Sequence, residues 1–212
     1  DASLVAFQAG GYDAVNGDVF LYYIPVTTLA PLTNLLQVTG NLYIYGTLIT
    51  DLVGLEHLQW VTADIYINDH ANLVSASLPH LLHVNQINVA GNAVLPDLNT
   101  LCPCLNEIAG ITVGGNASLT EFKNFAVGIT EFTNVAGNGV VSISAFDPGT
   151  PGTISLEGSF SDLVTMDGSI TFNPFAFTGA PFFPVLTAVN DILDTVDAVA
   201  GTPDVFGAVT TV

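Results

Sequence analysis

Carboxylates and histidines are the side chains of this chain that could carry out acid–base chemistry. Asp18 and Asp64 come nearest to a hydrolase pair, because they hold equivalent positions two repeats apart, at about 10 Å for ~4.8 Å per repeat. His80 and His83 have an i, i+3 spacing that could share a metal, but surface histidines are the better interpretation. No other reactive group converges on either pair, so we expect a protein that is not an enzyme.

Three aspartates late in the sequence, Asp191, Asp194 and Asp197, recur at every third residue. Clustered carboxylates without a basic partner repel each other unless a cation lies between them, and calcium prefers oxygen ligands. A weak calcium site is one expectation for this segment, and a solvated acidic edge that needs no ion is the other. We expect no further cofactor.

Aromatic side chains gather early in the sequence, at alternate positions of three segments that share one register. The group consists of Phe20, Tyr22, Tyr43, Tyr45 and Tyr66, with Tyr23 beside it. Exposed aromatic patches usually contact a partner protein or a sugar ring, so we expect this group to be a binding surface. The alternative is that residues 1–16 fold back and cover it as a cap.

A repeated nonapeptide predicts the elements that position these side chains: INVAGNAVL at 87–95, ITVGGNASL at 111–119 and TNVAGNGVV at 133–141. Apolar residues at each anchor and two residues after it indicate short strands with one buried face. Stacked in parallel, such strands form a β-solenoid of about nine coils. The expected anchors are Val19, Leu42, Ile65, Ile87, Ile111, Thr133, Ile154, Ile170 and Ile192.

A polar position follows each central anchor by five residues. Asn92, Asn116 and Asn138 hold it, and their amides can bond the backbone of a neighbouring coil at the turn. His70 falls at the same position, so we interpret it as a substitute turn residue rather than a catalytic one.

Segments between the strands place apolar residues three apart, which suits short 3₁₀ or half-turn stretches on the back of the solenoid. Leu-x-x-Leu-x-x-Val at 32–38 and again at 55–61, the first leading into residues 40–44, resembles the receptor L-domain branch of leucine-rich repeats. The resemblance covers residues 17–140 well and 150–197 loosely. It implies a single-stranded right-handed β-helix, and it is nearly silent about chemistry because such repeats share no active site.

Composition excludes several classes of partner. One basic residue, Lys123, stands against 19 acids, and the formal net charge is −18. Phosphate backbones and anionic membrane surfaces are recognised by Lys and Arg, so we expect no nucleic-acid partner. No apolar run reaches the ~18 residues of a bilayer span, so we expect no membrane insertion.

Cys102 and Cys104 are too close for an unstrained bridge, which leaves a strained loop, free thiols or disulfides to another subunit.

Both ends carry apolar, β-prone segments, which contain Leu4, Val5 and Phe7 at one end and Val205 and Phe206 at the other. In a single domain over 1–212 with repeats in 17–197, residues 1–16 and 198–212 either cap the solenoid or add as strands to a neighbouring copy. Repeated head-to-tail contacts give a filament. We therefore expect a non-enzymatic, extracellular or cell-surface structural protein that binds itself. The alternative is a monomeric adhesin or receptor-like module that binds a glycan or surface protein through the aromatic group. A start at Asp1 fits a processed, exported protein as well as a trimmed one.

Overall fold

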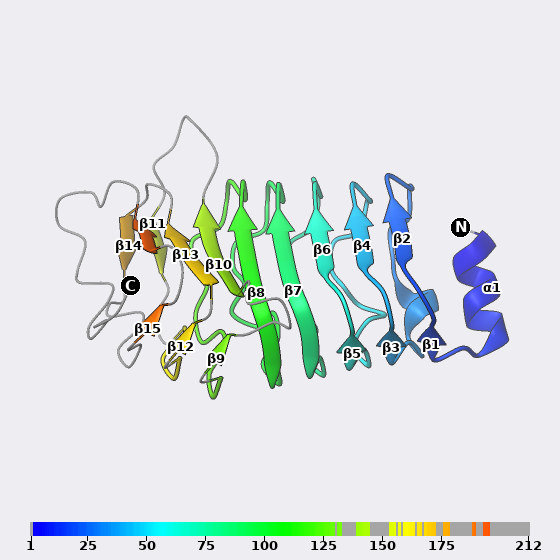
Figure 1. Ribbon diagram of the computed structural model, residues 1–212. Coiled ribbons are helices and arrows are strands. Elements are labelled where there is room, and N and C mark those ends of the chain that lie inside the picture. Colours follow the sequence, from blue (N-terminus) through cyan, green and yellow to red (C-terminus); the bar gives the residue numbers. More distant parts are fainter. Residues whose placement is uncertain are drawn as a thin grey trace.

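The computed structural model describes residues 2–129, 131–132, 139–144, 153–155, 157, 159–163, 165–166, 168–172, 176–178, 188–189 and 193–195. These residues are mostly β-strand, with one α-helix, α1 (Ala2–Gly10). Parallel strands stack side by side into a β-solenoid of about four turns (Figure 1). The prediction of an all-β solenoid is confirmed at this level.

One sheet of parallel strands runs the length of the stack. Its inward-facing ladder begins with Val19 in register with Leu42, Ile65, Ile87 and Ile111, so the first five expected anchors are confirmed. Three shorter strands, β1 (Ala14–Val15), β3 (Gln37–Val38) and β5 (Trp60–Val61), pair in the same sheet and join it at β7. The strands of the ladder are β2 (Val19–Tyr22), β4 (Leu42–Tyr45), β6 (Ile65–Asn68), β7 (His83–Ala90), β8 (Glu107–Gly114), β10 (Gly139–Ser144), β13 (Gly168–Phe172) and β16 (Leu193–Thr195).

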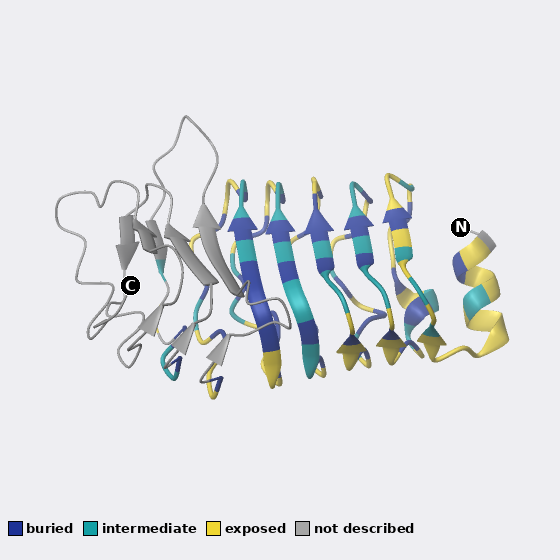
Figure 2. Cartoon of the chain, in the orientation of Figure 1, coloured by how far each residue is buried: buried dark blue, intermediate teal, exposed yellow. Residues whose placement is uncertain are grey.

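The alternation of the strands separates the core from the surface. Ile65, Ile87 and Ile111 have no exposed surface. Ile67 and Val89, two residues after Ile65 and Ile87, have none either. The residues between them, such as Tyr66 and Asn88, are half-buried on the outer face. Figure 2 shows these alternating bands along β6, β7 and β8. The predicted inward and outward sets are therefore confirmed.

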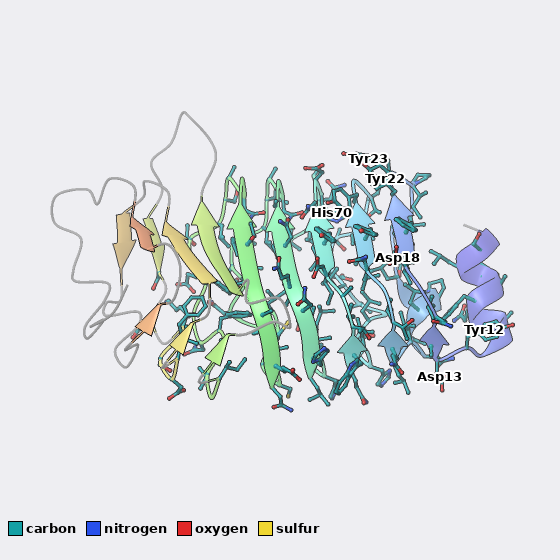
Figure 3. The ribbon with its side chains drawn as sticks, viewed as in Figure 1. Tyr12, Asp13, Asp18, Tyr22, Tyr23 and His70 are labelled. Carbon is teal, nitrogen blue, oxygen red and sulfur yellow. The ribbon has the colours of Figure 1, made fainter. Side chains whose placement is uncertain are left out.

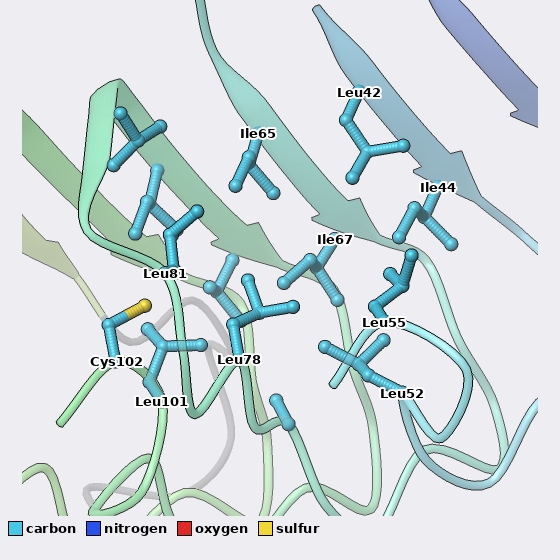
Figure 4. Packing of buried hydrophobic residues seen from close by; sticks show 14 of the residues in the cluster. Leu42, Ile44, Leu52, Leu55, Ile65, Ile67, Leu78, Leu81, Leu101 and Cys102 are labelled. Atoms are coloured by element: carbon cyan, nitrogen blue, oxygen red, sulfur yellow. The ribbon is translucent and has the colours of Figure 1, made fainter. Parts of the chain in front are cut away.

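Leucines on the back of the solenoid complete the core. Leu55 and Leu58 donate their backbone N–H groups to carbonyls three residues earlier, as a 3₁₀ turn does, and a short 3₁₀ helix, η1 (Ala30–Leu32), lies in the preceding coil. Figure 4 shows that Leu55, Leu78 and Leu81 lie across the core from the isoleucines of the strands. The expected back segments are confirmed in these coils.

Beyond Ile111 the register differs from the prediction. Val141 pairs with Ile111 and then with Ile170, which pairs with Leu193 rather than Ile192. Thr133, the expected partner of Ile111, lies outside the described residues. Ile154 belongs to a separate pair of strands, β11 (Thr153–Ser155) and β14 (Ala176–Thr178). A three-stranded sheet is formed by β9 (Glu131–Phe132), β12 (Thr165–Met166) and β15 (Ala188–Val189).

The helix α1 lies beside the first coil, at one end of the stack (Figure 1). Leu4 is buried and Phe7 packs partly against the core, whereas Val5 is exposed. This part of the chain is thus helical and contacts its own solenoid, although its sequence is β-prone. Val205, Phe206, Asp191 and Asp197 lie outside the described residues, and Asp194 lies in β16. Where the chain is described, no helix has the length and apolar character needed to cross a bilayer.

Candidate interaction surface

The aromatic face, defined as Phe20, Tyr22, Tyr43, Tyr45 and Tyr66, is assembled by the strand register. Phe20 lies next to Tyr43, which lies next to Tyr66, while Tyr22 lies next to Tyr45. The three strands β2, β4 and β6 therefore carry two parallel columns of rings on the outer face. Figure 3 shows Tyr22 and Tyr23 at the carboxyl end of β2.

The rings of the longer column stack on one another. Phe20 and Tyr43 have centroids 4.8 Å apart with planes 9° apart, and Tyr43 and Tyr66 are 4.9 Å and 12° apart. Rings that are this close and nearly parallel must overlap face to face with an offset. The overlap covers part of each face in the column. Phe20, whose one stacking partner among the described rings is Tyr43, keeps its outer face free at the end of the stack.

Exposure of the aromatic face increases toward that end. Phe20 is 63% exposed and Tyr22 is 57% exposed, whereas Tyr43, Tyr45 and Tyr66 are half-buried. The expectation that residues 1–16 might fold back over this face is wrong for its outermost rings. The reason is that α1 lies beside the end coil and leaves the outer face of β2 uncovered.

The end coil itself is incompletely buried. Val19 is half-buried, although its counterparts Leu42, Ile65 and Ile87 have no exposed surface. A cleft of about 260 Å³ lies against this coil and is lined by residues of α1, β1, β2 and η1. The half-buried apolar residues there are Phe7, Val15, Val19 and Ile24, and the exposed ones are Val5, Tyr12, Phe20, Tyr22 and Tyr23. We call this set the N-terminal end.

A ladder of carboxylates and amides precedes the strands. Asp18 accepts hydrogen bonds from the backbone N–H and side-chain amide of Asn41, at 2.6 and 3.1 Å. The Asn41 side-chain oxygen accepts the Asp64 backbone N–H at 3.1 Å, and Asp64 accepts the Asn85 amide at 2.7 Å. We call these four residues the Asp/Asn ladder. The two aspartates that resembled a hydrolase pair are thus separated by Asn41 and engaged in hydrogen bonds.

Phenol groups of the face also bind carboxylates. Tyr66 donates to Asp64 at 3.1 Å, and burial together with that carboxylate raises the pKa of Tyr66 to about 12. Tyr23 donates to Asp69 at 2.9 Å, and this hydrogen bond raises the pKa of Tyr23 above its ordinary value. Both tyrosines therefore remain neutral donors at physiological pH.

At His70, Asn92 and Asn116 the predicted polar position is buried and hydrogen-bonded, whereas Asn138 lies outside the described residues. Asn92 donates to the Ile67 carbonyl at 2.8 Å and accepts the His70 backbone N–H at 3.2 Å. His70 makes the same two bonds one coil earlier, because Nε2–H donates to the Ile44 carbonyl at 3.1 Å and Nδ1 accepts the Thr47 N–H at 3.3 Å. The interpretation of His70 as a substitute turn residue is confirmed.

The other histidines point to separate partners. His80 Nδ1 lies 2.6 Å from the Glu56 carbonyl, while His83 Nδ1 lies 2.9 Å from a Glu107 carboxylate oxygen and its ring stacks on Trp60. The structure does not bring His80 and His83 to a common metal. Within the described ranges, no three His, Cys, Asp or Glu side chains gather as metal ligands would.

The two cysteines are free thiols. Cys102 is buried in the core, and burial raises the pKa of its thiol, whereas Cys104 is exposed. No bridge joins Cys102 to Cys104, so the strained local loop is not formed.

Two features of this surface were missed in the sequence. The Asp/Asn ladder could have been found, because Asn41 falls one residue before its anchor as Asp18 and Asp64 do. The exposed N-terminal end could not have been found, because the packing of α1 decides which coil lacks a neighbour.

Comparisons with protein-family models, with curated proteins and with solved structures find no match to this chain.

Proposed function

We propose that this chain is a non-enzymatic structural protein whose copies assemble end to end into a filament outside the cell or at its surface. The observation that carries the proposal is the incomplete burial of the N-terminal end. An internal coil covers each face of its neighbours, whereas this end leaves core positions half open. A second copy stacked on it would cover them as an internal coil does.

The free energy available at this end is substantial. Complete burial of one large apolar side chain contributes about 1.5–3 kcal/mol. Val15, Val19 and Ile24 are half-buried, and Phe20 and Tyr22 are more than half exposed. Covering these five side chains would therefore contribute several kcal/mol, on the order of 4–7 kcal/mol at half the full value for each. Such a gain favours association, and it acts against the loss of translational and rotational freedom of the two copies.

Charge opposes the same contact. Each copy carries a formal net charge of −18, so two copies repel each other at long range, and salt screens that repulsion over about 10 Å at 0.1 M. Assembly should therefore be favoured by raising the ionic strength. The same negative charge is the reason why we propose no nucleic-acid partner.

The non-enzymatic part of the proposal is supported by how the reactive groups are used. Asp18, Asp64 and His70 each spend their hydrogen-bonding capacity on neighbouring coils. Groups held in this way stabilise the stack, and no nucleophile or second acid–base group converges on them in the part of the chain that the structure describes. The proposal also includes right-handed winding and likeness to receptor L-domains, which the repeats at 32–38 and 55–61 support.

A monomeric adhesin is the second candidate, and the exposure of Phe20, Tyr22 and Tyr23 favours it. A sugar ring binds most strongly on an open aromatic face. Stacking within the column covers part of the faces of Tyr43 and Tyr66, so an extended glycan lying across the column would meet mainly ring edges. This geometry makes the adhesin the weaker candidate.

Size measurement tests the two candidates. Purified chain would be followed by light scattering and negative-stain electron microscopy at about 20 mM and about 0.5 M salt, because the Debye length falls severalfold between them. Filaments whose yield rises with salt are expected. A monodisperse particle of 22.1 kDa at both salt concentrations would overturn assembly, and binding of that particle to a glycan array would favour the adhesin. Substituting serine for both Tyr43 and Tyr66 should leave end-to-end assembly intact.

A further inference from the structure

We propose that the outer edge of β2 is the docking site for β16 of a second copy of this chain, added as a parallel strand in the register of the ladder. This inference rests on the proposed function and names the two surfaces that would make the contact. It is carried by the backbone of β2, by the free face of Phe20 and by the register of the sheet.

The backbone of β2 has one paired and one open side. The N–H groups of Val19 and Tyr23 donate to carbonyls of the β4 coil at 2.8 Å, so the residues between them alternate to the other side, as in any parallel sheet. The N–H and C=O groups of Phe20 and Tyr22 therefore point away from β4. No described strand other than β4 pairs with β2, and an added strand would give these groups their partners.

A parallel strand from the far end of the sheet fits this edge without a change of direction. All strands of the sheet are parallel, and the ladder positions of β16 follow those of β13 in one register. Continuing that register places Leu193 beside Val19 of the next copy and Asp194 beside Phe20. Val19 would gain the apolar neighbour that its buried counterparts already have. Within Leu193–Thr195 the one acid, Asp194, then aligns with Phe20 rather than with Asp18.

The helix α1 must move for the strand to enter. It buries Leu4 and packs Phe7 partly against the core, and the cleft of about 260 Å³ remains against the coil that it flanks. Gly11 follows it with φ +65°, a backbone conformation that glycine adopts without strain. Release of α1 removes the burial of Leu4, which contributes about 1.5–3 kcal/mol, and the partial packing of Phe7. The entering strand must offset the loss of these contacts.

Disulfide trapping tests the pairing directly. Two single variants, Phe20→Cys and Asp194→Cys, would be made in a Cys104→Ser background that removes the exposed thiol, then mixed at high salt and oxidised mildly. Thr112→Cys mixed with Asp194→Cys is the matched control, because position 112 lies on the outer face but in the interior of the sheet. We expect a covalent heterodimer in the first mixture at a yield on the order of tenfold above the control, since neighbouring strands hold the two thiols at high effective concentration.

Each other outcome separates this inference from the proposed function. Filaments without cross-linking above the control would overturn the β2–β16 contact and leave end-to-end assembly standing. Phe20→Cys homodimers as the main product would overturn it in favour of a head-to-head contact. Particles that stay monomeric at every salt concentration would overturn both proposals. Deleting residues 1–10 gives a second readout: faster assembly is expected, and a folded but non-assembling chain would show that α1 itself makes the contact.

Discussion

Replacement of His70 by asparagine tests whether the ring acts as a substitute for the amide of the turn ladder. An asparagine here could donate to the Ile44 carbonyl and accept the Thr47 N–H, as Asn92 does for the equivalent groups one coil later. Both hydrogen bonds would be kept, and the loss would be limited to the volume of the ring. Replacement by alanine would instead leave two buried backbone groups without partners.

The magnitudes differ enough to separate the two variants. A residual cavity of tens of Å³ costs about 1 kcal/mol at ~24 cal/mol per Å³, so His70→Asn should lose about 1 kcal/mol at pH 8. Two unpaired buried groups cost roughly 1–3 kcal/mol each, so His70→Ala should lose about 2–6 kcal/mol.

Acid changes the comparison. Burial lowers the pKa of His70 below 6.5, by more than its bonds to Thr47 and Ile44 and the charge of Asp69 raise it. Below pH 6.5 the unfolded chain therefore binds a proton that the folded chain does not, and the stability contributed by the neutral ring is lost as pH falls toward the folded pKa. The slope is at most about 1.4 kcal/mol per pH unit.

Urea unfolding followed by circular dichroism from pH 8 to pH 5 would measure this effect. The free energy of unfolding of the wild-type chain should exceed that of His70→Asn by less and less as pH falls below 6.5. At the slope given above, the difference should disappear or reverse after about one pH unit. His57→Asn is the matched control, because His57 is exposed and its loss should leave the difference constant. Parallel stability curves for wild type and His70→Asn across this range would refute the reasoning.

Four further outcomes are expected. Ile87→Ala, in the middle of the core ladder, should lower the free energy of unfolding by about 2–5 kcal/mol in urea denaturation. Gly54→Ala should lower it by about 3 kcal/mol or more, because φ is +112° and the added Cβ would collide with a carbonyl of the preceding coil. Tyr66→Phe should remove the phenol whose pKa is about 12 from an absorbance titration. The free energy of unfolding of wild type should fall as pH rises from 10 to 12, and the variant should lack that contribution. Asn41→Asp should cost about 1–2 kcal/mol at low salt and less at high salt, because three carboxylates would then follow one another at ~4.8 Å.

The first five anchors were predictable because the sequence around them carries two independent signals. The anchors repeat every 22–24 residues, and a buried polar position follows each of the central ones at a fixed distance. Asn92 and Asn116 fix the turn while Ile87 and Ile111 fix the strand. A shift of one residue would place polar side chains in the core, so few registers compete.

After Ile111 those signals no longer agree. Residues 133–138 repeat the letters of the earlier turns, but the strand that pairs with Ile111 contains Val141 and Ile143. Both segments satisfy the alternation of a strand, and the choice between them depends on how the longer coil closes. Helix α1 was not predicted from the sequence for a related reason. A β-prone segment forms a strand only where it finds a partner, and Ala2–Gly10 instead places Leu4 against the core as a helix.

The Asp/Asn ladder shows how a chain with so large a negative charge can still stack in register. Parallel stacking places equivalent residues of successive coils ~4.8 Å apart, so an acid repeated at one position would build a column of like charges. Here Asn41 lies between Asp18 and Asp64, and Asn85 follows Asp64, so each carboxylate meets amide donors. The two carboxylates therefore stand two coils apart, and the amide donors offset the repulsion that remains between them. At the N-terminal end Asp18 has such an amide on its inner side alone, through Asn41. In the proposed assembly, an added strand would contact a carboxylate that is already hydrogen-bonded to Asn41, and salt would screen the long-range repulsion between the two copies.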